Sequence, residues 1–152
     1  MRTVNSIHID AGFDDVFRLA ADVERWPELL PHYRWVRTIW RSDDTSLVEM
    51  AARRGWIPVK WTSVQHCARS ESSIYYQHVG GPTRGMWVQW SLAPSRGGVD
   101  VTIVHELTLS HRVVGSRPGR WIVGRIFVEP IADRTLQHIK LLAEGMTSAR
   151  AA

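Results

Sequence analysis

The residues from Tyr33 to Leu109 form a succession of short β-rich runs joined by turn-like sequences. The runs are YRWVRTIWR, SLVEMAARR, WIPVKWTSVQHC, SSIYYQHV, GMWVQWSLAP and VDVTIVHELTL. The breaks between them (SDDT, RG, ARSE, GGPTRG and PSRGG) have the length and composition of hairpin connections. Consecutive hairpins predict an antiparallel sheet with strong curvature.

The flanking segments predict one strand and two short helices before this sheet, and one long helix after it. Residues 3–10 alternate as a strand, residues 13–23 have apolar side chains at helical spacing, and residues 26–30 form a short helical turn. The longest helical pattern covers residues 118–146, where Pro130 is expected to kink or interrupt the helix. Its buried stripe is predicted to consist of Ile126, Leu136, Ile139, Leu142 and Ala143.

These elements predict an α+β fold in which a curved antiparallel sheet of about seven strands wraps around the long C-terminal helix. We expect one domain over residues 1–147 and a disordered tail at 148–152. Because such a sheet cannot close tightly on one helix, a cavity is expected between them. Strand alternation predicts an inward face made mostly of apolar residues, with Ser63, Gln65 and His105 as the polar exceptions.

Composition excludes several other classes of protein. The net charge is +4, but the basic residues are scattered, which argues against nucleic-acid binding. There is one cysteine, Cys67, and no apolar run long enough to span a membrane, so we expect a cytoplasmic protein without stable membrane insertion. Neither a metal-binding motif nor a nucleotide-binding motif is present, and we expect no metal and no cofactor.

Two segments of the chain resemble a known family. ADVERWPELLPHY, after the opening strand and helix, and VEPIADRTLQHIKLLAE, near the end, are similar to the polyketide cyclase/dehydrase branch of the START-like, or SRPBCC, superfamily. The resemblance covers nearly the whole chain. It implies the helix-grip fold and a hydrophobic ligand in the cavity between sheet and helix. Because aromatase/cyclases, coenzyme-Q-binding proteins and lipid carriers share these features, the fold does not settle the function.

The resemblance to aromatase/cyclases also implies particular cavity residues. Their cavity-lining tryptophans and tyrosine match Trp26, Trp61, Trp90 and Tyr33, and the serine of their Trp-x-Ser-x-Arg strand matches Ser63. The arginine of that strand, thought to hold or polarise a ketone, is replaced here by Gln65. A neutral amide orients a carbonyl but does not supply the charge that stabilises an enolate.

The predicted catalytic residues are His105, which would move a proton, and Tyr33, Ser63 and Gln65, which would hold carbonyls. The predicted ligand contacts are Trp26, Trp61, Trp90, Met50, Met86, Val59, Ile103, Glu129 and Asp133. If the two acidic residues point inward, they are candidate bases. Each of these polar and aromatic side chains also has a purely structural interpretation, as a satisfied core residue or a solvated ion pair.

Three functions are compatible with these residues. The first is the binding and cyclisation or aromatisation of a polyketide-like molecule, by aldol condensation and dehydration. The second is non-catalytic transport of a quinone or lipid, which needs the same aromatic cavity but no acid or base. The third is a regulatory module that binds proteins through outward-facing tryptophans such as Trp35, Trp40 and Trp87. A homodimer is left open.

Overall fold

The computed structural model of the protein describes residues 1–108 and 127–152. In this part of the chain seven strands form one antiparallel sheet in the order β1-β7-β6-β5-β4-β3-β2. The strands are β1 (Arg2–Ile9), β2 (Tyr33–Ser42), β3 (Thr45–Arg54), β4 (Ile57–Ala68), β5 (Ser73–Gly80), β6 (Met86–Ser95) and β7 (Gly98–Leu107). From β2 to β7 every strand therefore pairs with its neighbour in sequence, and the predicted curved sheet is confirmed.

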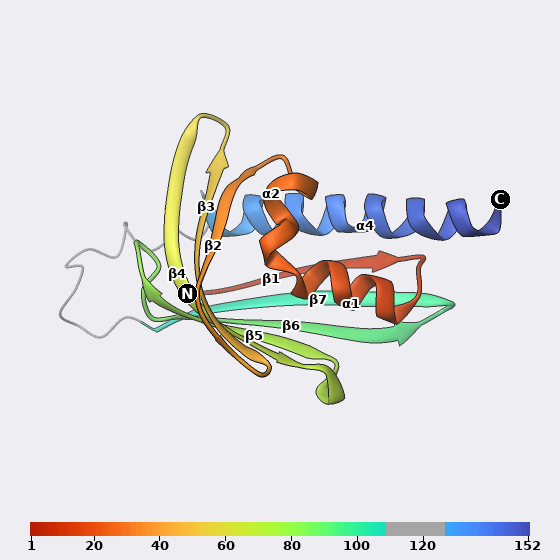
Figure 1. Ribbon diagram of the computed structural model, residues 1–152, viewed down its shortest axis with the longest axis horizontal. Coiled ribbons are helices and arrows are strands. Elements are labelled where there is room, and N and C mark those ends of the chain that lie inside the picture. Colours follow the sequence, from red (N-terminus) through yellow and green to blue (C-terminus); the bar gives the residue numbers. More distant parts are fainter. Residues whose placement is uncertain (109–126) are drawn as a thin grey trace.

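The helices lie at the beginning and the end of the chain. Helix α1 (Phe13–Ala21), the 3₁₀ turn η1 (Val23–Arg25) and the short α2 (Trp26–Leu29) connect β1 at one edge of the sheet with β2 at the other, and a second 3₁₀ turn, η2 (Arg69–Glu71), precedes β5. Helix α4 (Glu129–Ala151) lies along the sheet, which bends around it (Figure 1). Within the described residues, no helix has the length and apolar character that a bilayer crossing requires.

The C-terminal helix differs from its prediction in two respects. Pro130 does not kink α4 but lies in its first turn, where a missing N–H leaves no helical hydrogen bond unmade. Helix α4 continues through Ala151, where the sequence led us to expect a disordered tail at residues 148–152. The predicted start of the helical pattern at residue 118, its buried Ile126, and the end of the last predicted strand at Leu109 fall outside the described residues.

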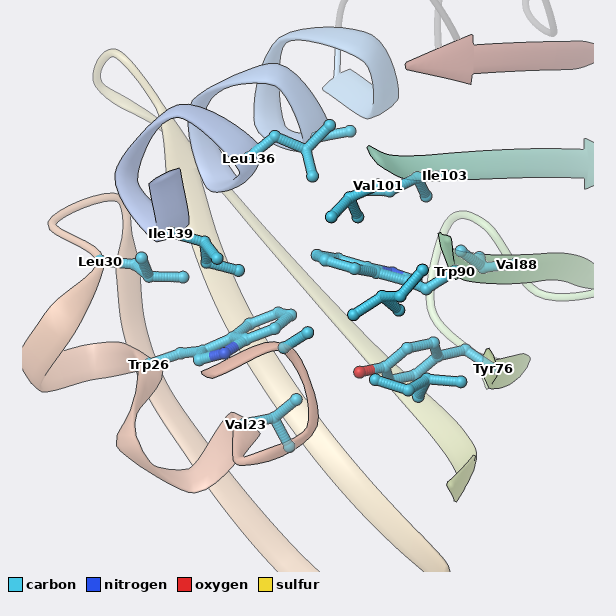
Figure 2. Close-up of a cluster of buried hydrophobic side chains, with 14 of the residues drawn as sticks. Val23, Trp26, Leu30, Tyr76, Val88, Trp90, Val101, Ile103, Leu136 and Ile139 are labelled. Carbon is cyan, nitrogen blue, oxygen red and sulfur yellow. The ribbon is translucent and has the colours of Figure 1, made fainter. Parts of the chain in front are cut away.

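The core lies between the concave face of the sheet and one side of α4. Leu136 and Ile139 of α4 are each 1% exposed and project toward side chains of β6 and β7 (Figure 2). Trp26 of α2 extends the core, because its ring lies 6.0 Å from that of Trp90 and its indole Nε1 donates to the carbonyl of Leu19 at 2.9 Å. The short α2 is thus anchored to the core by one large side chain.

Helix α4 is also connected to α1 by a buried carboxylate. Asp15, whose side chain is 7% exposed, accepts hydrogen bonds from Arg150 at 2.5 and 3.2 Å and from Arg18 at 2.5 Å. The hydrogen bond from Arg150, more than any other contact, holds the pKa of Asp15 below its usual range. This contact orders the last turns of α4 and explains why they continue as a helix.

Shortening a buried apolar side chain of α4 should destabilise the folded protein. We expect Ile139→Ala to lower the free energy of unfolding by about 2–5 kcal/mol, because the removed atoms leave a cavity in a well-packed core. Leu141, on the same helix but 67% exposed, provides the control: Leu141→Ala should change stability by about 0.5 kcal/mol or less. Urea unfolding measures the free energy of unfolding of both variants. Equal losses would contradict the placement of Ile139 in the core and of Leu141 at the surface.

The contribution of Asp15 should depend on pH. Because its pKa is lower in the folded protein than in the unfolded chain, its stabilisation is present above about pH 4 and is lost as the pH falls through the folded pKa. Asp15→Asn should therefore lower the Tm by a few degrees at neutral pH and have less effect below about pH 3. Asp14→Asn is the matched control, because Asp14 is exposed and pairs with Arg69 at the surface. A pH-independent loss in Asp15→Asn would argue against the ion pair.

Candidate functional site

A cavity lies between the concave face of the sheet and the first half of α4. Together with its open mouth, part of which is solvent, it holds about 660 Å³ of space not filled by atoms. Its walls come from α2, from β2 to β7 and from the N-terminal part of the α4 segment. The lining residues are Trp26, Tyr33, Met50, Val59, Trp61, Tyr76, His78, Thr83, Met86, Val88, Trp90, Ile103, His105, Phe127, Val128, Ile131, Ala132 and Thr135.

Most of the predicted site residues lie in this wall. They are Trp26, Tyr33, Met50, Val59, Trp61, Met86, Trp90, Ile103 and His105. Strand alternation accounts for the positions of those on β4, β6 and β7, since every second residue of these strands points to the concave face. Their contact with a ligand stays a prediction.

Aromatic rings form a continuous line across the cavity. Tyr33, at the start of β2, lies 4.9 Å from Trp26 and 6.2 Å from Trp61, ring centre to ring centre, in edge-on arrangements. Trp61 in turn stacks on His78, with centres 5.9 Å apart and an angle of 14° between the ring planes. Trp90 continues the line on the other side of Trp26, with its ring centre 6.0 Å from that of Trp26 (Figure 2). The cavity therefore offers flat apolar surfaces and ring edges, which suit a planar or aromatic ligand.

Two histidines face the cavity as neutral imidazoles. Burial lowers the pKa of His78 to about 4 and that of His105 to about 3, the latter with a smaller contribution from His78. His78 Nδ1 is hydrogen-bonded to Thr83 Oγ1 at 2.6 Å, whereas His105 Nδ1 is buried and has no partner among the described residues. The ordinary pKa on which the prediction for His105 rested does not apply to the folded protein. An uncharged imidazole donates or accepts a hydrogen bond, but it is a weak base.

A third buried histidine supports the cavity wall from behind. His32, which is 2% exposed, is hydrogen-bonded through Nε2 to Thr135 Oγ1 at 2.8 Å. Because the Thr135 hydroxyl donates to the carbonyl of Ile131 at 2.7 Å, it accepts from His32, which assigns the ring proton to Nε2. Burial lowers the pKa of His32 to about 4, with smaller contributions from the charges of His138 and Arg134. The neutral imidazole thus fixes the rotamer of a hydroxyl-bearing residue in the lining.

Two tyrosines add hydroxyl groups. Tyr33 and Tyr76 are 7% and 5% exposed, and burial raises the pKa of both phenols above the usual value. Both therefore remain protonated at neutral pH and are able to donate a hydrogen bond. Tyr76 also accepts one from Gln65 Nε2 at 3.0 Å.

Ser63 and Gln65 point inward as predicted but do not line the cavity. Ser63 is fully buried and donates to the carbonyl of Gln77 at 3.1 Å. Gln65 donates to the carbonyl of Ala21 at 2.9 Å as well as to Tyr76. Because their donors are already used within the protein, the prediction that they hold carbonyls of a ligand is not supported by their positions. Gln65 instead ties the end of α1 to β4 and β5.

The two acidic residues of α4 do not reach the cavity either. Asp133 is exposed and accepts a hydrogen bond from Asn5 Nδ2 at 2.6 Å, and the backbone carbonyl of Glu129 lies 3.5 Å from the same nitrogen. They belong to the contact between α4 and β1, and neither is placed as a base. In the described ranges, no group of three or more His, Cys, Asp or Glu side chains could hold a metal ion.

Several lining residues were not predicted. The alternation in SSIYYQHV would have identified Tyr76 and His78, since both share the inward face with the fully buried Ile74. Thr83 lies in the turn between β5 and β6, and no periodic signal indicates where such a side chain points. Thr135 and Ile131 fall one turn apart on the stripe of α4 and could have been found from helical spacing.

The arrangement of one curved antiparallel sheet around one long helix is shared with proteins of the START-like class. The structure of a START superfamily protein from Mycobacterium smegmatis matches with a TM-score of 0.75 and 12% identity, covering 95% of this chain and 98% of that one. The aromatase/cyclase ZhuI of Streptomyces sp. R1128 matches with a TM-score of 0.81 and 17% identity over 95% and 93% of the two chains. The helix-grip fold is thereby confirmed.

Comparison of the sequence with family models identifies the family within this fold class. Residues 9–137 match the family described as polyketide cyclase / dehydrase and lipid transport, and the chain belongs to this family. The two-domain aromatase/cyclase BexL from the BE-7585A biosynthetic pathway is similar over half its length, with a TM-score of 0.80 and 22% identity over 95% of this chain. No curated protein sequence matches significantly.

The buried histidines should make the protein sensitive to mild acid. Between pH 6.5 and 5 the unfolded chain takes up protons at His32, His78 and His105, whereas the folded protein does not. The free energy of unfolding should therefore fall by about 1.4 kcal/mol per pH unit for each of them. Urea unfolding at several pH values measures this slope. His78→Gln should reduce it by about one proton, and an unchanged slope would show that His78 titrates equally in both states.

Proposed function

We propose that the protein binds a polyketide-like molecule in the cavity and catalyses its cyclisation and aromatisation. The observation that carries this proposal is the line of aromatic rings formed by Trp26, Tyr33, Trp61 and Trp90, which continues to the neutral imidazole of His78. Such a wall confines a flexible chain of ketones to a folded, nearly planar shape. Family membership supports the same substrate class.

Catalysis comes mainly from folding the chain. Holding one carbon of the substrate against one of its own ketone carbons removes the rotational freedom that otherwise opposes ring closure, and such orientation is worth several kcal/mol. The apolar lining also excludes water, which strengthens each hydrogen bond to a carbonyl. The tryptophans therefore determine which ring forms, and the polar groups assist the proton transfers.

The chemistry is an intramolecular aldol reaction followed by loss of water. A carbon next to a ketone loses a proton to the neutral imidazole of His105, and its electron pair forms a bond to the ketone carbon held opposite. The oxygen of that ketone takes up the proton, and Tyr33 donates a hydrogen bond to it. The resulting alcohol leaves as water together with a neighbouring hydrogen, and enolisation of the remaining ketones gives the aromatic ring. No oxidant is needed.

A non-catalytic carrier is the second candidate, and one observation favours it. Burial makes His78 and His105 weak bases, and no carboxylate lines the cavity within the described residues. A quinone or another planar lipid needs only apolar walls and a few hydrogen-bond donors, and Tyr33 and Tyr76 provide these. This candidate predicts tight binding without any chemical change.

The two candidates are distinguished with a linear 1,3,5-triketone that bears an aryl group at one end and a methyl ketone at the other. Ring closure and loss of one water would give a phenol, which mass spectrometry detects. We expect His105→Ala to lower turnover by about 100-fold while the affinity for the probe changes by about threefold or less, because the imidazole moves a proton and adds little binding area. Trp61→Ala should weaken binding by about tenfold, since it removes a large apolar wall.

Trp87→Ala is the control, because Trp87 is on the outer face of β6 and does not line the cavity. Phenol formation no faster than without protein, despite tight binding, would refute the cyclase and favour the carrier. Failure of the probe to bind at all would contradict the cyclase.

A further inference from the structure

The turn between β3 and β4 presents the most exposed tryptophan in the described residues. Trp56 is 88% exposed, compared with 53% for Trp40 and 40% for Trp87. The two strands end at Arg54 and Ile57, so Gly55 and Trp56 form a two-residue turn. Gly55 has a φ of +59°, the conformation that a type II′ hairpin needs at its first central residue. This turn places Trp56 at the outermost point of the hairpin.

We refer to residues 53–57 as the β3–β4 tip. The tip projects away from the rest of the molecule at the top of Figure 1. A Cβ atom built on Gly55 meets no other atom of the described residues within 4 Å, so none of these residues covers the turn at that point. With 88% of Trp56 exposed, packing against the described residues does not explain the presence of its indole.

The tip is also strongly basic. The sequence from Met50 to Val64 contains three basic residues and no acidic one. Arg53 and Arg54 precede Trp56 by three and two residues, are both exposed, and form no salt bridge within the described residues. Lys60, in contrast, lies 3.9 Å from Glu49. The neighbouring strand adds an exposed arginine, Arg34, next to the position where Tyr33 pairs with Ala52.

The same hairpin forms one wall of the cavity. Val59 and Trp61 line the cavity only three and five residues beyond Trp56 in the sequence. The tip is thus the outer end of the wall along which an apolar molecule would pass. A surface that accepts the tip would lie close to that wall.

We propose that the β3–β4 tip docks on a membrane surface that contains anionic lipids. A single exposed apolar residue is ordinary. A tryptophan in a turn, preceded by two arginines that form no salt bridge within the described residues, has the composition of an interfacial membrane anchor. The indole occupies the headgroup region, and the guanidinium groups bind lipid phosphates. A narrow turn offers far less area than the roughly 800 Å² per partner of a stable protein complex, so a lipid surface fits the tip better than a folded protein does.

Docking at the tip would bring the cavity wall to the surface in which apolar molecules dissolve. It involves no membrane-spanning segment, and it does not depend on whether the cavity ligand is a polyketide, a quinone or a lipid. Docking and catalysis are therefore separate properties of the chain.

The experiment is sedimentation of the full chain with large unilamellar vesicles of phosphatidylcholine, with and without about one third phosphatidylglycerol. We expect binding to the anionic vesicles only, and release as the ionic strength is raised. Trp56→Ala should weaken this binding by about tenfold. Arg53→Gln with Arg54→Gln should weaken it by about 25-fold, at about fivefold for each arginine.

Two exposed residues away from the tip provide matched controls. Trp87→Ala and Arg96→Gln remove a tryptophan on the outer face of β6 and an arginine in the β6–β7 turn, and both variants should bind as the wild type does. The affinity for the triketone probe in solution should stay unchanged in all four variants, which separates docking from ligand binding. The proposal is overturned if the wild type does not sediment with anionic vesicles, or if the tip variants and the controls bind equally well.

Discussion

The structure depends on the packing of one long helix against one strongly curved sheet. The apolar stripe of α4, with Leu136 and Ile139 at its centre, is buried only where the sheet bends toward it. A seven-stranded sheet built from short hairpins is wider than the strip that one helix covers. The cavity lies where the concave face and the first half of α4 face each other without packing closely, so stability and ligand capacity have the same origin.

The polar groups of the cavity wall are uncharged, and this limits their chemistry. Three histidines and two tyrosines lie fully or partly buried on or behind the wall, and burial moves each pKa in the direction that keeps the group neutral. Such groups recognise a ligand by donating or accepting hydrogen bonds. In the proposed cyclisation they would contribute little through charge, and the shape of the cavity would supply most of the acceleration.

Much of the fold and part of the site could be predicted from the sequence. Period-two alternation correctly placed Trp61, Trp90 and His105 on the concave face, because each strand of the meander has one buried side. Alternation does not reveal hydrogen-bond partners, so it did not show that Gln65 is held by Ala21 and Tyr76. Nor does it show how burial shifts the pKa of His105, since that depends on what packs around the ring in three dimensions.

The alternation of side chains in the strands has a consequence for how this protein could diverge. Val59, Val88 and Ile103 line the cavity from three different strands, while their immediate neighbours in sequence face the opposite side of the sheet. A single substitution at one of these positions would remodel the interior and leave the exterior surface intact. The shape of the cavity and the composition of the outer surface are therefore encoded in interleaved but separate sets of codons, and each is free to evolve without the other.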